Sequence, residues 1–391
     1  MNRLTTSWGV SELARFPEDP RDTLRAWDAA DEYLLRFLAG DDDTPATDLS
    51  GEVVVLGDRW GSLVTALAAH RPTQITDSYL GREGTRANLR RNGTDPDTLR
   101  LLSTQAPPPE RIDVLLVRVP KSLALLEDQL HRLAPALHPN SVVVGTGMVK
   151  EIHTSTLRLF ERFIGPTRTS LAEKKARLIF STPTASPDRN GDPWPLTYTL
   201  DTDAGAGAGV TVTNHAGIFC AERLDIGTRF FLKHLPERLP QGSAEPARIL
   251  DLGCGNGVVG TAAALAHPGA EVLFADESYQ AVASAEATYL ANVPEGRGKG
   301  EFAVGDGTAG ISEGSIDLVL NNPPFHSHQA TTDATARRMF AGARDVLRPG
   351  GELLVVGNRH LGYHVRLRRL FGNCEVIASD PKFVVLRAVR R

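Results

Sequence analysis

Several residue types that would place a protein in a special class are scarce in this 391-residue chain. Its three cysteines, Cys220, Cys254 and Cys374, are too few and too scattered for a disulfide framework or a zinc site. No apolar run reaches the roughly 18 residues that a transmembrane helix needs, and the first residues do not resemble a signal peptide. We therefore expect a cytoplasmic protein with no bound metal and no membrane partner.

The chain also lacks an excess of positive charge. Its 43 Lys and Arg residues stand against 47 Asp and Glu, and a net charge of −4 does not by itself indicate a nucleic-acid-binding protein. The hydrophobic fraction of 41% and the charged fraction of 23% are ordinary for a globular protein. Because 391 residues exceed what one hydrophobic core usually organises, we expect two domains.

The two halves of the chain have the same pattern of apolar segments. Strands alternate with helices at a spacing that predicts parallel βαβ units in each half. The pattern indicates a tandem duplication of one doubly wound, Rossmann-like α/β domain. The corresponding segments, first half with second, are 52–61 with 248–257, 74–79 with 273–279, 112–120 with 316–324, and 137–144 with 347–354.

A proline- and glycine-rich stretch, residues 181–195, separates the halves and is incompatible with a helix or a central strand. We therefore place the two domains at residues 1–185 and 196–391. Just after this boundary, two short apolar segments flank residues 205–209, which predicts a β-hairpin with a flexible tip. The next helix is expected over residues 229–235.

A glycine loop follows the first strand predicted in the second half. Gly253, Gly255 and Gly257 lack a Cβ atom, so the backbone amides of this loop can approach a ligand closely. A helix begins at Val258, and its free N–H groups can bind a carboxylate. A dinucleotide-binding loop would need its third glycine at that position. A nicotinamide cofactor is therefore disfavoured.

A second motif, residues 321–325 (Asn-Asn-Pro-Pro-Phe), follows the apolar segment 317–320. Pro323 and Pro324 stiffen this turn because each fixes its φ angle. A glycine loop at one strand end and an Asn-Pro-Pro-aromatic turn at another form a two-part signature. Together they resemble S-adenosylmethionine-dependent methyltransferases that modify an exocyclic amino nitrogen.

The turn is expected to carry the chemistry. An exocyclic amino group is a poor nucleophile because its lone pair is delocalised into the ring. The side-chain oxygen of Asn322 and the carbonyl of Pro323 can accept hydrogen bonds from that group, localising the lone pair and aiming it at the methyl donor. Phe325 offers a face for a flipped base, a contact of about 1–3 kcal/mol. His326 is interpreted as a loop residue that contacts RNA.

The remaining predicted contacts are to the cofactor. Asp251 is a candidate partner for its ammonium group. Asp276, at the end of the next strand, can bind both ribose hydroxyls, although it could instead cap the following helix, a role for which Ser278 competes. For Asp306 the resemblance implies a contact to the adenine amino group. The predicted cofactor-binding residues are Phe219, Thr228, Asp251, Gly253, Cys254, Gly255, Asn256, Gly257, Asp276, Glu277, Ser278, Asp306, Gly307 and Asn322.

The order of motifs resembles that of the bacterial rRNA guanine-N2 methyltransferases, and it is carried by residues 215–219, 224–228, 251–257 and 322–326. This resemblance implies two seven-stranded class I methyltransferase domains, of which only the C-terminal one is active. By it, Phe219 and Thr228 border the cofactor pocket. The tail of the chain looks more like the large-subunit enzymes, which implies 23S rRNA, within a ribosomal subunit or its precursor, as the partner.

Three alternatives stay open at this stage. The target could be 16S rRNA, or a glutamine side chain of a protein, since a side-chain amide and a base amino group both present an NH₂ group to the acceptors of this turn. A non-catalytic RNA-binding or ribosome assembly protein is a third possibility. The intact glycine loop and the presence of Asn322 argue against that last alternative.

The N-terminal copy differs from the C-terminal one where chemistry would take place. Bulky Arg59 and Trp60 lie between its two loop glycines, and residues 118–121 (Arg-Val-Pro-Lys) replace the Asn-Pro-Pro-Phe turn. We therefore expect this copy to have lost cofactor binding and to bind RNA. The arginines expected to form an RNA-binding basic stripe on one helix are Arg82, Arg86, Arg90 and Arg91. The alternative interpretation is that they lie on a solvent-exposed helix face with no binding role.

Overall fold

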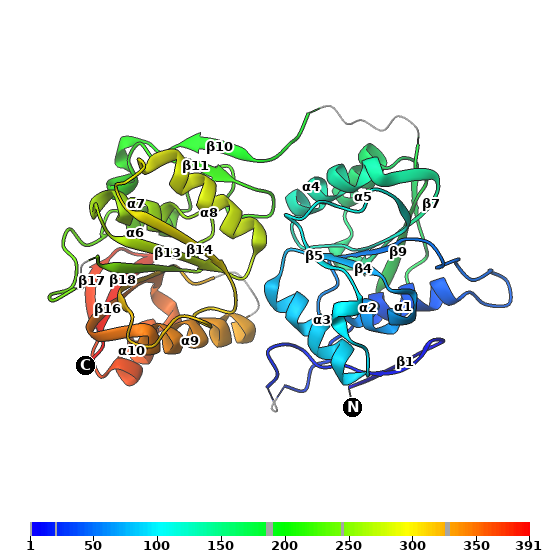
Figure 1. Cartoon of the computed structure of the whole chain (residues 1–391), viewed down its shortest axis with the longest axis horizontal. Coiled ribbons are helices and arrows are strands. Elements are labelled where there is room, and N and C mark those ends of the chain that lie inside the picture. Colours follow the sequence, from blue (N-terminus) through cyan, green and yellow to red (C-terminus); the bar gives the residue numbers. More distant parts are fainter. Residues whose placement is uncertain (1, 20–21, 185–190, 244–245, 325–328) are drawn as a thin grey trace. The chain divides into compact units, whose positions relative to one another are not determined.

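The computed structural model describes residues 2–19, 22–184, 191–243, 246–324 and 329–391. The chain divides into two compact units, Met1–Trp194 and Pro195–Arg391 (Figure 1). Each unit contains one seven-stranded sheet, and the two sheets have the same strand order. The predicted pair of doubly wound α/β folds is confirmed.

In the C-terminal unit, the sheet order is β14-β13-β12-β15-β16-β18-β17. The first five of these strands are parallel, and β18 runs antiparallel to both of its neighbours. The strands are β12 (Arg248–Leu252), β13 (Glu271–Asp276), β14 (Lys299–Val304), β15 (Ile316–Asn321), β16 (Leu347–Asn358), β17 (Glu375–Ser379) and β18 (Phe383–Val389). The helices are α6 (Ile226–Leu232), α7 (Val258–Ala266), α8 (Tyr279–Asn292), α9 (Gln329–Val346), the 3-10 helix η6 (Arg359–Leu361) and α10 (Tyr363–Phe371).

The N-terminal unit repeats this plan with the order β5-β4-β3-β6-β7-β9-β8. Its strands are β3 (Val53–Leu56), β4 (Thr73–Thr76), β5 (Leu101–Ser103), β6 (Ile112–Arg118), β7 (Leu137–Met148), β8 (Thr167–Thr169) and β9 (Ala176–Ser181), with a separate hairpin of β1 (Arg3–Thr6) and β2 (Gly9–Glu12). Its helices are α1 (Ala29–Ala39), α2 (Ser62–Ala66), α3 (Tyr79–Arg91), α4 (Leu123–Leu133) and α5 (Thr154–Phe163), with the 3-10 helices η1 (Ala68–His70), η2 (Pro96–Thr98), η3 (Ala134–Ala136) and η4 (Val149–Glu151).

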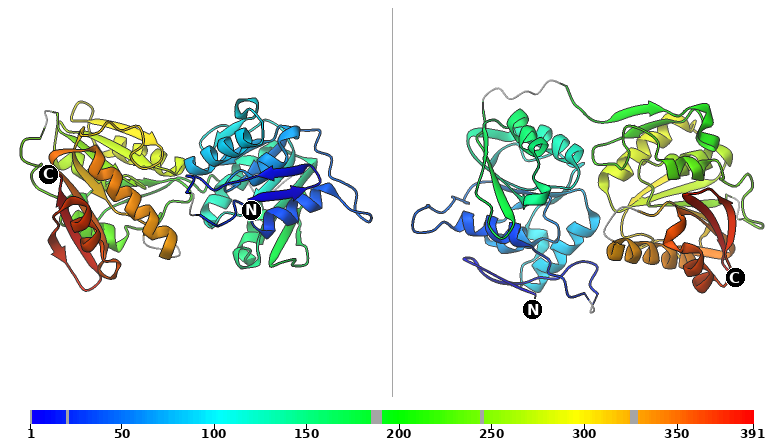
Figure 2. Two further views of the ribbon diagram at one scale, coloured as in Figure 1. Left: turned by 90° about the horizontal axis from the view of Figure 1, so that it is seen from below. Right: turned by 180° about the vertical axis from the view of Figure 1, so that it is seen from behind.

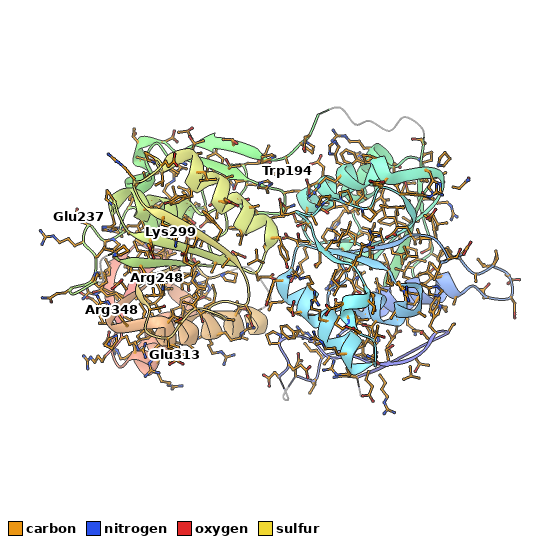
Figure 3. The ribbon with its side chains drawn as sticks, viewed as in Figure 1. Trp194, Glu237, Arg248, Lys299, Glu313 and Arg348 are labelled. Atoms are coloured by element: carbon orange, nitrogen blue, oxygen red, sulfur yellow. The ribbon has the colours of Figure 1, made fainter. Side chains whose placement is uncertain are left out.

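Helices cover both faces of each sheet, so the central strands are apolar throughout (Figures 1 and 2). Successive residues of a strand point to opposite faces. In β15, Leu318 and Leu320 therefore pack in the cluster formed with α6, α7 and α8, whereas Val319 packs in the cluster formed with α9 and α10. Side chains fill the layers between sheet and helices in both units (Figure 3).

Two polar contacts fix the register of β15 against β12. At the amino-terminal end, the carboxylate of Asp317 accepts a hydrogen bond from the backbone N–H of Arg248 at 2.8 Å and pairs with Arg348 (both arginines are labelled in Figure 3). At the other end, the side-chain amide of Asn321 donates to the carbonyl of Leu252 at 2.7 Å. The pairing of Leu252 with Asn321 therefore brings the ends of the two strands together.

The glycine-rich hairpin has more structure than the sequence suggested. Strands β10 (Leu196–Thr199) and β11 (Thr211–Asn214) pair as predicted, and the residues between them include the 3-10 helix η5 (Thr202–Gly207). Ala204 is fully buried there. A Cβ at Gly205 would lie 2.7 Å from the Cα of Lys233, which explains why small residues are needed.

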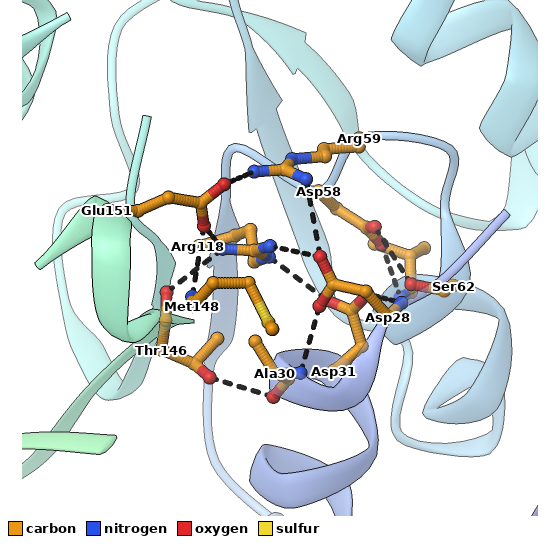
Figure 4. A network of polar contacts seen from close by, with 11 residues as sticks. Asp28, Ala30, Asp31, Asp58, Arg59, Ser62, Arg118, Thr146, Met148 and Glu151 are labelled. Atoms are coloured by element: carbon orange, nitrogen blue, oxygen red, sulfur yellow. Dashed lines mark hydrogen bonds and ion pairs between the residues drawn. The ribbon is translucent and has the colours of Figure 1, made fainter. Parts of the chain in front are cut away.

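The N-terminal unit contains a buried charge network at the carboxyl end of β6 (Figure 4). The guanidinium of Arg118 is 1% exposed and forms ion pairs with Asp28 at 2.7 Å, Glu151 at 3.1 Å and Asp31 at 3.3 Å. Arg59 adds a second cation, which pairs with Glu151 at 2.8 Å. Burial acts to raise the pKa of Glu151, but Arg118 and then Arg59 hold it at about 2.

Removing this guanidinium should destabilise the N-terminal unit. We expect Arg118→Met to lower the free energy of unfolding by about 3–5 kcal/mol, because it leaves the buried carboxylate of Asp31 and two half-buried ones without their cation. Chemical denaturation of the full chain measures this loss. The matched control is Arg111→Met, whose exposed ion pair with Asp113 is expected to contribute at most about 1 kcal/mol. Equal losses in the two variants would contradict the stabilising role of the network.

The decrease in stability caused by Arg118→Met should depend on pH. The pKa of Glu151 in the folded chain lies below its ordinary value of 4.5, so its stabilising contribution is present above that value. The contribution is lost as the pH falls toward 2. The difference in stability between the wild-type chain and Arg118→Met should therefore shrink over that range.

Candidate functional site

The glycine loop lies at the carboxyl end of β12 and opens α7. Gly253, Gly255 and Gly257 all have positive φ angles, of 72°, 54° and 72°. A Cβ at Gly257 would come within 2.6 Å of the backbone of Ala285, so this glycine is required for packing. At Gly255 a Cβ would meet no described atom within 4 Å. Gly255 therefore lines open space, as expected of a loop that receives a ligand.

Asp276, at the end of β13, holds this loop in place. Its carboxylate accepts hydrogen bonds from the backbone N–H groups of Gly255 and Ser278, both at 3.0 Å. Burial raises the pKa of Asp276, and these hydrogen bonds oppose that rise. Ser278 caps helix α8 by accepting from the N–H of Ala281 at 3.0 Å, so Asp276 is not the cap. Glu277, between them, is exposed.

Two residues of the predicted cofactor set are buried beneath the loop. Asp251 is 3% exposed and accepts a hydrogen bond from the N–H of Gly260 at 2.8 Å, which ties β12 to α7. Burial raises the pKa of Asp251 to about 7. Cys254 is 6% exposed, and burial raises the pKa of its thiol well above 9.0, as expected of a packed residue rather than a nucleophile. Binding of the cofactor's ammonium by Asp251 stays a prediction.

The Asn-Pro-Pro turn follows β15 directly. The Nδ2 group of Asn322 donates a hydrogen bond to the hydroxyl of Thr228 at 2.9 Å. Its Oδ1 atom is buried and accepts no hydrogen bond from any described residue. Pro323 is buried and Pro324 is exposed, whereas the predicted stacking residue Phe325 and its neighbour His326 lie outside the described residues.

Other predicted cofactor residues lie at the same carboxyl edge of the sheet. Asp306 follows β14, next to Gly307, and pairs with Arg338 of α9. The side chain of Asn256 donates to the side-chain oxygen of Asn214 at 3.0 Å, joining the loop to β11. Phe219 is 58% exposed. These cofactor roles stay predictions.

The helix predicted over residues 229–235 instead spans Ile226–Leu232. Asp225 sets its start by accepting a hydrogen bond from the N–H of Thr228 at 2.9 Å. The Asp-x-x-Thr spacing is a helix-capping signal that could have been read from the sequence. The site residues that sequence reasoning did not assign are Asn214, Asp225, Asn321 and Arg338.

The four arginines predicted as a stripe all lie on α3: Arg82, Arg86, Arg90 and Arg91. Three of them have carboxylate partners, since Arg82 pairs with Glu83 at 3.9 Å, Arg86 pairs with Asp97 at 2.9 Å and Arg91 pairs with Glu18. Arg90 is exposed. Part of this positive charge is therefore neutralised locally, and contact with RNA stays a prediction.

The described helices include none that is both long and apolar enough to cross a membrane. Two family models match the chain, the RLMG N-terminal domain over residues 1–185 and the methyltransferase small domain over residues 209–387. A solved structure, the 16S rRNA N2 G1207 methyltransferase RsmC from T. thermophilus in complex with AdoMet and guanosine, superposes with a TM-score of 0.74. It is 21% identical and the match covers 100% of this chain and 97% of that one, which shows a shared fold.

Curated relatives match the chain over nearly its whole length. The ribosomal RNA large subunit methyltransferase G of Streptomyces coelicolor is 70% identical over 387 residues, covering 99% of this chain and all of that protein. The protein of the same name from Aeromonas hydrophila is 43% identical over 382 residues, with 97% of each chain covered. With these identities over both units, the chain belongs to the ribosomal RNA large subunit methyltransferase G family.

Proposed function

We propose that this chain methylates the exocyclic N2 amine of a guanine in 23S rRNA, using S-adenosylmethionine. The names of its relatives support an rRNA substrate of the large subunit. The observation that carries the chemistry is the buried, unsatisfied Oδ1 atom of Asn322 beside an open glycine loop. A ribosomal subunit or its precursor is the proposed partner, and a cytoplasmic location follows from that partner.

The glycine loop and Asp276 fit the proposed cofactor. Gly255 leaves space that any Cβ would fill, and Asp276 is positioned at the strand end where an acidic residue can bind ribose hydroxyls. The N-terminus of α7 can bind a carboxylate. When bound, S-adenosylmethionine supplies an electrophilic methyl group on a sulfonium. Phe219, Thr228, Asp306 and Gly307 are proposed to complete the pocket.

The Asn-Pro-Pro turn would act on the acceptor. Asn322 Oδ1 and the carbonyl of Pro323 both accept hydrogen bonds, which matches the two N–H donors of an amino group. Accepting both hydrogens localises the nitrogen lone pair and orients it for in-line attack. The methylated amine can lose its extra proton afterwards, so an ionised base is not required.

The alternative functions have less support. Guanine-N2 methylation of 16S rRNA is the reaction in the name of the superposed RsmC, which shares only 21% identity with this chain. Methylation of a protein glutamine would use the same turn, but it would leave the N-terminal unit, the proposed RNA-binding unit, without a role. A purely RNA-binding role would not require the open space at Gly255 or the unsatisfied acceptor of Asn322.

We assign the two activities to different units, catalysis to residues 196–391 and RNA binding to residues 1–185. In the N-terminal unit, Arg118 lies in the position of Asn322, and the charge network fills the corresponding strand ends. RNA binding by the N-terminal unit is supported by the arginines of α3, and the catalytic unit, which must also contact the RNA that it methylates, carries an excess of positive charge of its own. Residues 337–391 contain twelve Lys and Arg against four Asp and Glu, and Arg368 and Arg369 are exposed there. RNA phosphates match such a surface.

Cofactor binding should depend on the aspartate at the end of β13. We expect Asp276→Ala to weaken S-adenosylmethionine binding roughly 10–100-fold, because it removes an acceptor for ribose hydroxyls and the clamp on Gly255. Isothermal titration calorimetry on the full chain measures this affinity. The control is Asp77→Ala, which removes an aspartate that directly follows β4 in the N-terminal unit and should leave the affinity unchanged. A lower affinity for S-adenosylmethionine in Asp77→Ala would mean that the N-terminal unit also contributes to cofactor binding.

Methyl transfer should require Asn322. The wild-type chain should transfer a labelled methyl group to one guanine N2 in 23S rRNA from a strain lacking the enzyme, as located by mass spectrometry. Asn322→Ala should abolish transfer and leave cofactor affinity nearly unchanged, because the amide acts on the acceptor. Transfer of the labelled methyl group to 16S rRNA or to a protein would show that the proposed substrate is wrong. A near-normal rate of methyl transfer by Asn322→Ala would contradict the proposal that Asn322 activates the acceptor amine.

The α3 stripe should contribute to RNA affinity. Reversing Arg86 and Arg90 to Glu should weaken rRNA binding and reduce the slope of log affinity against log salt by about 0.7–0.9 for each phosphate that the variant no longer binds. Filter binding at several salt concentrations measures both quantities. The matched control reverses Arg25 and Arg36, which are exposed and lie outside α3. If both double variants lose the same affinity, the effect is one of net charge and the stripe is not a binding surface.

A further inference from the structure

Three residues from two elements form a hydrogen-bonded chain that ends at the reactive turn. Asp225, the N-cap of α6, contacts the hydroxyl of Thr228 at 3.4 Å and its backbone N–H at 2.9 Å. Thr228 is 7% exposed, and its hydroxyl oxygen lies 2.9 Å from Nδ2 of Asn322. Asn322 is 94 positions further along the chain. The fold thus connects the first turn of α6 to the side chain proposed to activate the acceptor.

The direction of these hydrogen bonds follows from the chemistry of Asp225. A carboxylate can only accept, so the Thr228 hydroxyl must donate its single hydrogen to it. The hydroxyl oxygen is then left as an acceptor, and only the NH₂ group of Asn322 can donate to it. This arrangement determines which end of the Asn322 amide faces Thr228. Without it, the amide could rotate by 180° and present NH₂ instead of oxygen.

We propose that Asp225 and Thr228 are positioning residues that hold the Asn322 amide with Oδ1 directed at the acceptor amine. This inference rests on the proposed function and extends it to a second layer of residues. In this orientation the Asn322 amide presents its oxygen, an acceptor, to the amino group of the substrate. In the rotated orientation it would present its NH₂ group, a donor, to another donor. The Asp225 carboxylate also polarises the hydroxyl, which strengthens its bond to Nδ2 and increases the negative charge on Oδ1.

The burial of Oδ1 supports this assignment. A buried carbonyl oxygen without a donor is unfavourable, so a freely rotating amide would turn to satisfy it where a donor was available. Among the described residues no group donates to Oδ1, while Nδ2 is satisfied by Thr228. The orientation in the structure is therefore the one that leaves acceptor capacity for a ligand.

The test compares two substitutions at Thr228 in the full chain. Thr228→Val keeps the branched shape and removes the hydroxyl, whereas Thr228→Ser keeps the hydroxyl. We expect Thr228→Val to lower kcat for methyl transfer to 23S rRNA on the order of 10–100-fold. Because valine keeps the branched shape with which Thr228 borders the proposed cofactor pocket, the affinity for S-adenosylmethionine should change less than about three-fold, and Thr228→Ser should recover most of the wild-type kcat. The matched control is Thr261→Val, a fully buried threonine of α7, which should keep wild-type kcat.

The possible results separate three explanations. Normal kcat in Thr228→Val would overturn the positioning role while leaving the proposed function intact. A raised Kd for S-adenosylmethionine with unchanged kcat would also overturn it, because Thr228 would then act only as a cofactor contact. A lower thermal unfolding midpoint in Thr228→Val than in Thr261→Val, with no recovery by Thr228→Ser, would make the residue a structural one. No transfer to rRNA by the wild-type chain would overturn the proposed function and the positioning role together.

Discussion

The parallel pairing of β12 with β15 is the constraint on which the site depends. Asp317 fastens the amino-terminal end of β15 to Arg248, and Asn321 fastens its carboxyl end to Leu252. A register shift of one residue would turn every side chain of β15 to the opposite face and separate the turn from the glycine loop. The two contacts therefore stabilise the sheet and also place Asn322 beside the loop.

The N-terminal unit has the same strand pairing with different residues at the strand ends. Its β3 and β6 pair in the same register, Leu56 with Val117, so Arg118 takes the place that Asn322 has in the other unit. There a guanidinium and the carboxylates that surround it occupy the strand ends. A buried cation of this kind stabilises the fold only while all its partners remain. The N-terminal unit therefore has the same architecture with a charge network at the corresponding strand ends.

The sequence predicted those features that depend on local spacing. The glycine pattern 253–257, the turn 321–324 and the helix at Val258 are short motifs next to apolar strands, and the structure places them as expected. Helix α6 begins three residues before the predicted helix because Asp225 caps it, and a cap depends on one side chain. The pairing of Arg118 with Asp28 joins positions 90 apart, and no periodicity encodes such a contact. Likewise, the neutralisation of Arg86 by Asp97 depends on how a loop folds back on α3.

The distribution of hydrogen bonds at the carboxyl edge of the sheet would give the proposed site a preference for an amino group. The amide nitrogens of Asn321 and Asn322 are both satisfied, by Leu252 and Thr228, while both amide oxygens are buried without a donor among the described residues. Each such oxygen costs about 1–3 kcal/mol in the free chain. An amino group that donates one N–H to Asn322 Oδ1 and the other to the carbonyl of Pro323 recovers the cost at Asn322 on binding, whereas a ring nitrogen or a carbonyl leaves Asn322 Oδ1 unsatisfied and adds repulsion. Selection for an amine would therefore come from unsatisfied acceptors that the fold holds in place before the substrate arrives.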